Sequence, residues 1–305
     1  KNIYLMKPLL KFKQSFNFNF FSIRKFAFIL SFLIIILSLF IFFKKGLNLG
    51  IDFIGGIMID AKFSSSPDLN QLRNDLGSLN LGNFEIQEFG IADNVLIKIE
   101  KQRGDESKQL EAINKVKKIL PVDVDYRRIE FVGPKVGQEL KIMGLKAVIY
   151  SLIAMFMYIW FRFSGWQFGL GAVLAVVHDV ITTIGFFAIT QIEFNLASIA
   201  AILTIAGYSI NDTVVVFDRI RENLAKVKII KFDKLLNTSI NETLSRTIMT
   251  SLTTLIALIA LLLLGGEVIK GFILAMIWGV IVGTYSSIFI ASPLIALLGY
   301  EKDND

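Results

Sequence analysis

The chain has 305 residues, of which 54% are hydrophobic and 19% are charged, and its mean hydropathy is +0.60. Soluble domains carry about 25% charged residues, so this composition argues against a single soluble globule. The absence of cysteine excludes disulfides, thiol catalysis and cysteine-ligated metals, and the single histidine, His178, makes a zinc site improbable. We therefore expect no metal and no bound cofactor.

Six apolar segments are long enough to cross the hydrocarbon core of a membrane. They are residues 26–43, 143–161, 166–189, 194–217, 248–264 and 271–298. The first segment ends in Lys44 and Lys45 without a small-residue cleavage site, which predicts a retained anchor and not a cleaved signal peptide. Six spans place both termini on the same side of the membrane.

The distribution of positive charge predicts which side that is. Residues 1–25 contain six basic residues and no acid: Lys1, Lys7, Lys11, Lys13, Arg24 and Lys25. The connection 218–247 is also basic, and the positive-inside rule places both segments in the cytosol. We therefore predict a cytosolic basic tail at 1–25, a membrane domain of five further helices at 142–298 with a cytosolic loop at 218–247, and a cytosolic tail at 299–305.

The segment 44–141 is then exported, and it holds equal numbers of basic and acidic residues. Because the excess positive charge lies in a short tail beside an apolar span, no nucleic-acid partner is expected. The exported segment alternates between strand-like and helical patterns. Strands are predicted at Gly55–Phe63, Phe84–Phe89, Val95–Glu100 and Val124–Val132, and helices at Pro67–Leu79 and Asp105–Leu120.

The resulting order β-α-β-β-α-β predicts an α+β, ferredoxin-like domain between the first two transmembrane helices. This domain contains no histidine and no acidic cluster at ligand spacing. We expect a binding or lever module, and not an enzyme.

Ionisable residues inside the spans are costly and are therefore functional candidates. His178 and Asp179 lie near the middle of the third span, Asp212 lies in the cytosolic half of the fourth, and Arg246 lies at the start of the fifth. Desolvation favours the protonated form of a buried carboxyl group, whereas a nearby guanidinium favours the charged form. Asp212 and Arg246 are thus candidates for a proton-coupled switch. Asp179 and His178 are weaker candidates for the same role, because they can also pair with each other.

Polar side chains extend these sites along their helices. Thr204 and Tyr208 share a helix face with Asp212, with Asn211 beside them, and Thr250 shares a face with Arg246. Such stripes must face one another, a partner or water, although hydroxyl groups also serve simply as interhelical hydrogen-bond donors. In the sixth span, small residues at four-residue spacing predict close helix packing. They are Ala275, Gly279, Gly283, Ser287 and Ala291.

Energy sources other than a membrane gradient find no support. The sequence contains no G-x-x-x-x-G-K-[ST] phosphate loop, no H-E-x-x-H motif and no plausible Ser-His-Asp arrangement. ATP hydrolysis is therefore not expected, and the transmembrane gradient remains.

Several motifs resemble the SecF family. They are Leu49–Gly56 (LGIDFIGG), Val132–Leu140 (VGPKVGQEL), His178–Val180, Gly207–Asn223 (GYSINDTVVVFDRIREN), Ser245–Thr254, Gly283–Ser287 and Ser292-Pro293. The resemblance spans about residues 47–298, with the motifs in order. It implies a member of the RND superfamily in the bacterial cytoplasmic (inner) membrane, which together with SecD uses the proton motive force to promote late steps of Sec-dependent protein export.

The resemblance also implies the partners and the sites. SecD would be a separate chain, and the SecYEG channel, YajC and unfolded secretory polypeptides would be the other partners. The positions that match the family's proton-coupling residues are Asp212 and Arg246. Two alternatives stay open: a scaffold subunit that holds the translocase together through the small-residue stripe and the exported domain, and half of an RND-type exporter of small molecules.

Overall fold

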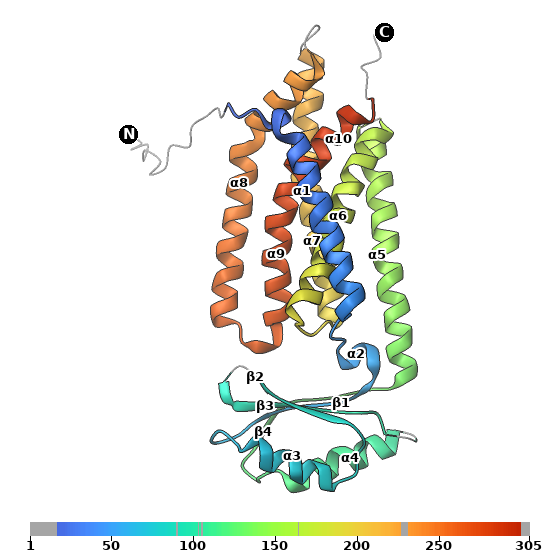
Figure 1. Ribbon diagram of the computed structural model, residues 1–305, viewed down its shortest axis with the longest axis vertical. Coiled ribbons are helices and arrows are strands. Elements are labelled where there is room, and N and C mark those ends of the chain that lie inside the picture. Colours follow the sequence, from blue (N-terminus) through green and yellow to red (C-terminus); the bar gives the residue numbers. More distant parts are fainter. Residues whose placement is uncertain are drawn as a thin grey trace, which may run out of the picture.

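The computed structural model describes residues 17–299 except 90, 103, 105, 164 and 227–230. Most of the basic tail expected at 1–25, and all of the tail at 299–305 except Gly299, lie outside the described residues. The chain forms a long helical bundle with a smaller α/β domain at one end (Figure 1). Helix α1 begins, and α10 ends, at the end of the bundle that lies away from this domain.

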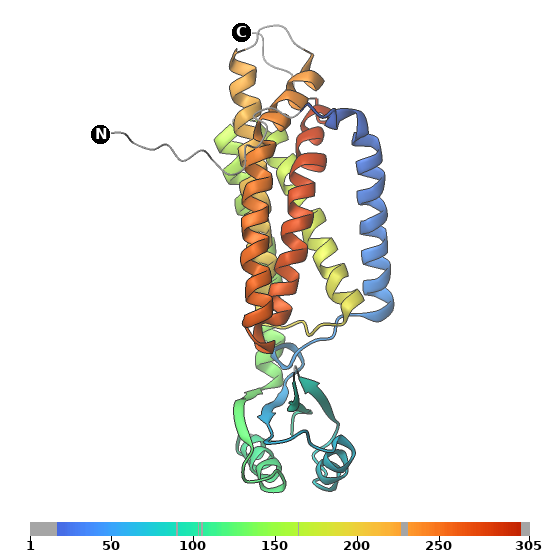
Figure 2. The same ribbon diagram turned by 90° about the vertical axis from the view of Figure 1, so that its left-hand side faces the viewer.

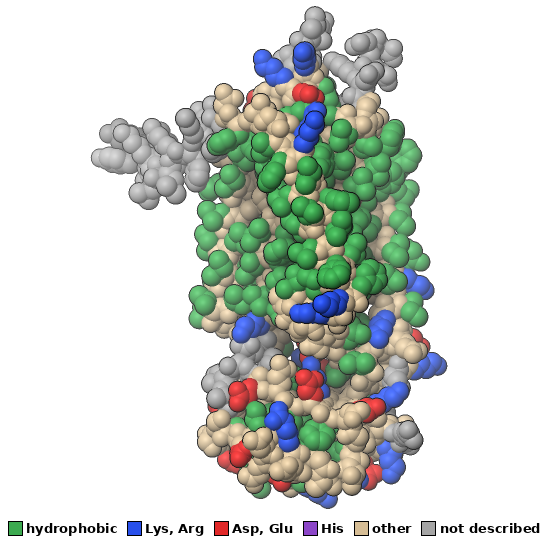
Figure 3. Space-filling model, viewed as in Figure 1, with side chains coloured by type: hydrophobic (Ala, Val, Ile, Leu, Met, Phe, Trp, Pro, Cys, Tyr) green, Lys and Arg blue, Asp and Glu red, His purple; other side chains and the backbone are tan. Residues whose placement is uncertain are grey.

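The described residues contain six helical segments that are long and apolar enough to cross a membrane. They are η1–α1 (Phe20–Ile23, Arg24–Lys45), α5 (Pro134–Phe163), α6 (Trp166–Thr190), α7 (Leu196–Lys226), α8 (Phe232–Leu264), and α9 with its extensions (Lys270–Ser286, a π turn at Ser287–Ala291, and α10 at Ser292–Leu297). A short helix, η2 (Glu267–Ile269), precedes α9. On the face seen in Figure 3, apolar side chains form a broad band over the bundle, and charged side chains lie mostly beyond the two edges of this band. The predicted fold class, a six-span helical membrane protein, is confirmed.

The segment 218–247, expected as a loop, is instead helical on both sides of residues 227–231. Helices α7 and α8 have 31 and 33 residues, so each is roughly 45–50 Å long and exceeds a hydrocarbon core of about 30 Å. Their charged ends project beyond the core and are joined by an ion pair between Arg219 and Glu242 at 2.7 Å. Charge alone predicted a loop because it does not distinguish a connection from an exposed helix end.

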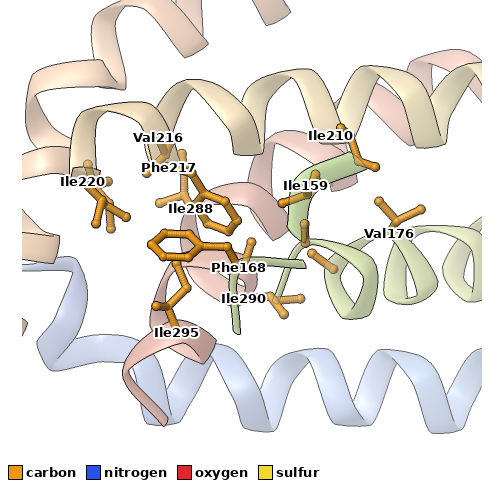
Figure 4. Close-up of a cluster of buried hydrophobic side chains, with 14 of the residues drawn as sticks. Ile159, Phe168, Val176, Ile210, Val216, Phe217, Ile220, Ile288, Ile290 and Ile295 are labelled. Carbon is orange, nitrogen blue, oxygen red and sulfur yellow. The ribbon is translucent and has the colours of Figure 1, made fainter. Parts of the chain in front are cut away.

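Three helices form the interior of the bundle. The buried share of the most apolar stretch is 61% in α6, 50% in α7 and 56% in α9–α10. It is only 17% in α1 and 11% in both α5 and α8. Phe168 of α6 and Phe217 of α7 are almost fully buried, and their ring centroids lie 5.1 Å apart. Ile288, in the π turn, lies beside them in the same cluster (Figure 4). Helices α6, α7 and α9 therefore fix the geometry of the membrane region.

The α/β domain has the predicted order of elements. It consists of α2 (Ile51–Ile54), β1 (Gly56–Lys62), α3 (Leu69–Ser78), β2 (Phe84–Phe89), β3 (Ile91–Ile99), α4 (Glu106–Ile119) and β4 (Asp125–Val132). The sheet has the order β2-β3-β1-β4, and each neighbouring pair is antiparallel. Because α5 already begins at Pro134, the last residues of the expected segment 44–141 belong to a membrane helix.

The two faces of the sheet have different surroundings. Ile57, Ile59 and Ile97 are fully buried against α3 and α4, which cover the face turned away from the bundle (Figure 2). Met58 and Asp60 alternate with these residues on the other face. Together with the ends of α6, α7 and α9, that face lines a cavity of about 460 Å³. The sheet is thus separated from part of the bundle by open space.

Asp60 is the least expected residue on this second face. It is 2% exposed, and its Oδ1 atom has no hydrogen-bond partner among the residues that the structure describes. Burial raises the pKa of the Asp60 carboxyl above its ordinary value of 3.8, and the nearby Arg127 and Arg128 offset this only in part. A raised native pKa means that the folded state binds the proton more tightly than the unfolded state does. This tighter proton binding therefore stabilises the folded state below about pH 3.8, and the stabilisation is lost as the pH rises through the pKa of Asp60 in the folded state.

We predict that Asp60→Asn, which cannot ionise, stabilises the purified chain at pH 7, because burial penalises the charged form of the Asp60 carboxyl group. Thermal unfolding in detergent measures this difference, which should shrink near pH 4. Asp125→Asn, at the exposed start of β4, is the matched control and should change little. Equal stability of the native chain and Asp60→Asn at pH 7 would contradict the prediction.

Candidate functional site

Asp179 lies at the point where the three interior helices meet. Its side chain on α6 is fully buried. Its Oδ2 atom accepts hydrogen bonds from the Ser209 hydroxyl of α7 at 2.6 Å and from the Ser286 hydroxyl of α9 at 2.7 Å. Its Oδ1 atom lies 3.0 Å from Nδ1 of His178. This buried carboxyl group is therefore satisfied by partners from all three interior helices, and it ties them together.

Small residues on α9 and its extension make this arrangement possible. All five residues of the predicted small-residue stripe are buried within the chain: Ala275, Gly279, Gly283, Ser287 and Ala291. A Cβ atom at Gly279 would overlap the side chain of Ile205, and one at Gly283 would lie 3.2 Å from Cβ of Ser209. The close approach of α9 to α7 brings Ser286 and Ser209 to the same carboxylate oxygen. The π turn that follows Ser286 marks a local irregularity of the kind often found at functional sites.

Asp212 has a contrasting environment, although it lies on the same side of α7 as Ser209. Its side chain is 2% exposed, and its Oδ2 atom has no hydrogen-bond partner in the described part of the chain. The buried hydroxyl groups of Thr213 and Thr247 also lack partners there. A buried polar atom without a partner costs roughly 1–3 kcal/mol, and a charged one costs more. The site around Asp212 is therefore polar but unsatisfied.

Arg246 on α8 lies near this unsatisfied site. It is exposed and close enough to Asp212 to interact with it electrostatically, although no ion pair within 4.0 Å joins them among the ion pairs of the described residues. Arg219 donates to Glu242 at 2.7 Å, about one helical turn from Arg246. This contact holds the start of α8 against α7. The Asp212 and Arg246 side chains are thus near each other without being locked together.

The other residues of the predicted stripe do not converge on Asp179. Thr204 and Asn211 are exposed on α7, and the Thr204 hydroxyl donates to the carbonyl of Ala200 in its own helix. Thr250 donates in the same way to the carbonyl of Arg246 at 2.9 Å. Thr204 and Asn211 are thus polar side chains exposed on a helix that is long and apolar enough to cross a membrane.

Tyr208 takes part in a separate set of hydroxyl contacts. Its hydroxyl lies 3.4 Å from Oγ of Ser251 on α8, and Ser251 lies 2.6 Å from Oγ1 of Thr284 on α9. These contacts connect α7, α8 and α9 close to Asp212.

Sequence reasoning missed the residues that satisfy the buried polar groups. Ser209 and Ser286 were not singled out, although Ser209 lies three positions before Asp212 and Ser286 lies next to the stripe residue Ser287. Tyr285 was missed as well: its hydroxyl donates to the carbonyl of Ala27 at 2.8 Å and so links α9 to α1. The helical spacing of the two serines from the predicted residues was the available signal.

His178 lies beside Asp179 but faces different neighbours. Its ring centroid is 6.1 Å from that of Tyr285, and its Nε2 atom has no hydrogen-bond partner in the described residues. Across the same residues, no cluster of three or more histidine, aspartate or glutamate side chains is suitable for a metal ion.

These features define a multi-pass membrane protein with acidic groups among its central helices and a ferredoxin-like domain at one end. Residues 111–301 match the family described as protein export membrane protein SecD/SecF, C-terminal, and residues 40–67 match the SecD/SecF GG motif. The protein translocase subunit SecF of Rickettsia bellii is 44% identical over 300 residues, which cover 97% of this chain and 98% of the relative.

Two solved structures are also similar. The crystal structure of SecDF from Thermus thermophilus, a translocon-associated membrane protein, matches with a TM-score of 0.82 and 36% identity over 95% of this chain. SecDF in a super-membrane-facing form matches with a TM-score of 0.69 and 35% identity over 96% of this chain. In both cases the chain spans 40% of the SecDF chain. The chain belongs to the SecF family of protein-export membrane proteins.

We predict that Ser209→Ala and Ser286→Ala each lower the free energy of unfolding by about 1–3 kcal/mol, because each removes a hydrogen bond to the buried Asp179 carboxyl group. Chemical denaturation of the purified chain in detergent measures this loss. Ser287→Ala is the matched control, since the buried hydroxyl of Ser287 donates to the carbonyl of Thr284, one turn earlier in the same span, and not to Asp179. A loss for Ser287→Ala as large as that for Ser286→Ala would show that Asp179 does not organise the three helices.

Proposed function

We propose that the chain is the SecF subunit of a bacterial protein translocase and that, with a separate SecD chain, it uses the proton motive force to promote late steps of protein export. Its function is transport, and no chemical reaction is assigned to it. The observation that carries the proposal is the buried, unsatisfied carboxyl group of Asp212, which lies close to the exposed Arg246. Near-full-length similarity to SecF of Rickettsia bellii supports the same function.

The proposed orientation places both termini in the cytosol and the α/β domain outside the inner membrane. The start of α1 carries Arg24 and Lys25, and the projecting ends of α7 and α8 carry further basic residues. These groups lie at the end of the bundle opposite the α/β domain (Figure 1). The positive-inside rule supports this orientation.

The proposed switch depends on the cost of leaving a carboxylate unpaired at membrane depth. A proton taken up by Asp212 removes that cost and releases Arg246. Loss of the proton restores the charge and draws the guanidinium toward the carboxylate. One elementary charge that crosses the membrane supplies about 2.3 kcal/mol per 100 mV, which is comparable to the coupling free energies of about 1–3 kcal/mol that link sites in proteins. Asp179 and His178 have a supporting role: they hold the interior helices together beside the switch.

The proposed binding surface for SecD is the polar side of α7 next to Arg246. Thr204, Gly207 and Asn211 are exposed there, at a depth where polar groups cannot face lipid without cost. A partner helix that covers this surface would also close the site around Asp212. The SecYEG channel, YajC and unfolded secretory polypeptides are the further proposed partners.

The scaffold alternative loses its main support. The feature that favoured it was the small-residue stripe on the last span, which together with the exported domain was expected to hold the translocase together. Gly279 faces Ile205, Gly283 faces Ser209 and Ala291 faces Gly171, so these residues contact α7 and α6 of the same chain. The stripe holds this chain together and is not available to a partner.

The test is export of a slowly translocated secretory protein in cells depleted of SecF and complemented with variants. Asp212→Asn and Arg246→Met should each lower gradient-dependent export by on the order of tenfold, since coupling free energies of this kind correspond to about 5–150-fold effects. Both variants should still purify with SecD.

Asp218→Asn is the matched control. It removes the same charge from α7 at the level of the exposed helix end, where Asp218 pairs with Arg162 at 2.8 Å. It should export within about twofold of the native chain, because exposed ion pairs contribute only about 0–1 kcal/mol. Native export and native gradient dependence for Asp212→Asn would refute the proposed switch.

A further inference from the structure

The segment that connects α1 to β1 contacts the membrane domain through its backbone. The amide of Gly50 donates to the carbonyl of Phe194 at 2.9 Å, and the amide of Phe194 donates to the carbonyl of Asn48 at 2.7 Å. The Asn48 side chain also donates to the carbonyl of Gln191 at 3.0 Å. The sequence motif Leu49–Gly56 therefore begins as a short strand-like contact with the loop between α6 and α7. The switch proposed above assigns no role to this motif.

Asp52, in the single-turn helix α2, connects the same motif to α7. Its Oδ2 atom accepts a hydrogen bond at 2.9 Å from the amide of Leu196, the first residue of α7. The side chain of Asn195 already accepts from the amide of Ser198 as a local cap. Asp52 thus supplies a second cap from another part of the chain, and its negative charge is favourable at the positive end of the α7 dipole.

A second contact connects the sheet to the same loop. Lys98 of β3 forms an ion pair with Glu193 at 2.5 Å, and the two side chains are only 14% and 22% exposed. Gly50 leaves the room for this pair, because a Cβ atom there would lie 2.6 Å from Oε1 of Glu193. Two polar contacts, one from α2 and one from β3, therefore hold the α/β domain to the four-residue segment Glu193–Leu196, which ends at the first residue of α7.

Helix α7 continues from these contacts to the proposed switch without interruption. Asp212 lies sixteen positions after Leu196 on the same helix, a distance of roughly 24 Å. A tilt or shift of α7 at Asp212 must therefore displace its first residue, and with it Asp52 and Glu193. The cavity of about 460 Å³ beside the sheet, lined by Met58 and Ile192 among others, leaves space for such a displacement.

We propose that Asp52 and the Lys98–Glu193 ion pair form the mechanical joint through which movement of α7 is transmitted to the α/β domain. Both are positioning residues, since neither exchanges the proton. This inference rests on the proposed function, and it goes beyond it by naming the contacts that transmit the movement. The joint passes the displacement directly to β1, which begins at Gly56, four residues after Asp52.

The test measures movement and proton uptake separately. Because the chain contains no cysteine, Val122→Cys and Leu264→Cys supply two label sites, one on the α/β domain and one at the end of α8, both highly exposed. Spin-label distances are recorded for the complex with cysteine-free SecD in vesicles, with and without a proton gradient. A pH-sensitive dye inside the vesicles reports proton uptake.

The native chain should change its label distance when the gradient is applied, and Asp52→Ala should reduce the population that moves by about tenfold, the scale of a coupling of roughly 1.4 kcal/mol. Proton uptake should persist in Asp52→Ala, whereas Asp212→Asn should abolish it. Asp52→Asn, which retains an acceptor oxygen, should recover most of the movement. Asp68→Ala is the matched control, because Asp68 caps α3 inside the domain by accepting from the amides of Asn70 and Gln71. The Asp68→Ala chain should show the same change in label distance as the native chain.

Charge exchange tests the ion pair independently. Lys98→Glu and Glu193→Lys should each weaken the movement, and the two together should restore it. Native movement in Asp52→Ala and in both single charge variants, with proton uptake intact, would overturn the joint and leave the proposed function standing. Proton uptake that persists in Asp212→Asn would instead overturn the proposed function.

Discussion

The cost of placing a carboxylate inside a membrane protein governs this structure, and its two buried acids meet that cost in opposite ways. Asp179 receives two serine hydroxyls and a histidine nitrogen, so it can stay in place as a fixed point among α6, α7 and α9. Asp212 lies one helical turn from Ser209, yet its Oδ2 atom has no hydrogen-bond partner in the described part of the chain. A satisfied acid stabilises one arrangement, whereas an unsatisfied acid gains from any change that supplies a proton or a positive charge.

This contrast relates the architecture to the proposed function. Small residues allow α9 to lie close to α7, so the interior helices are rigid around Asp179. Helix α8 is mostly exposed and meets α7 through polar contacts such as Arg219 with Glu242. At its other end, α7 contacts the α/β domain through Asp52. The fold therefore places the unsatisfied Asp212 site between the closely packed helices around Asp179 and the α/β domain, which lies beside open space.

Much of the fold follows from sequence pattern alone. Apolar length predicted six spans, and alternation predicted the β-α-β-β-α-β order, because both depend on local periodicity. The extent of α7 and α8 was underestimated, since a charged helix end and a charged loop have similar compositions. Asp179 and Asp212 were identified by their cost in a membrane. Their different environments could not be predicted, because Ser209 and Ser286 reach Asp179 only through the tertiary approach of α7 and α9.

The central claim is that Asp212 exchanges a proton. Infrared difference spectroscopy of the complex with SecD, recorded while the pH is stepped, detects the carbonyl stretch of a protonated carboxyl group directly. The account predicts a carboxyl band that titrates in the native chain, shifts on isotopic labelling of aspartate, and is missing in Asp212→Asn while the other carboxyl bands persist. An unchanged set of titrating carboxyl bands in Asp212→Asn would contradict it and place the proton on another group.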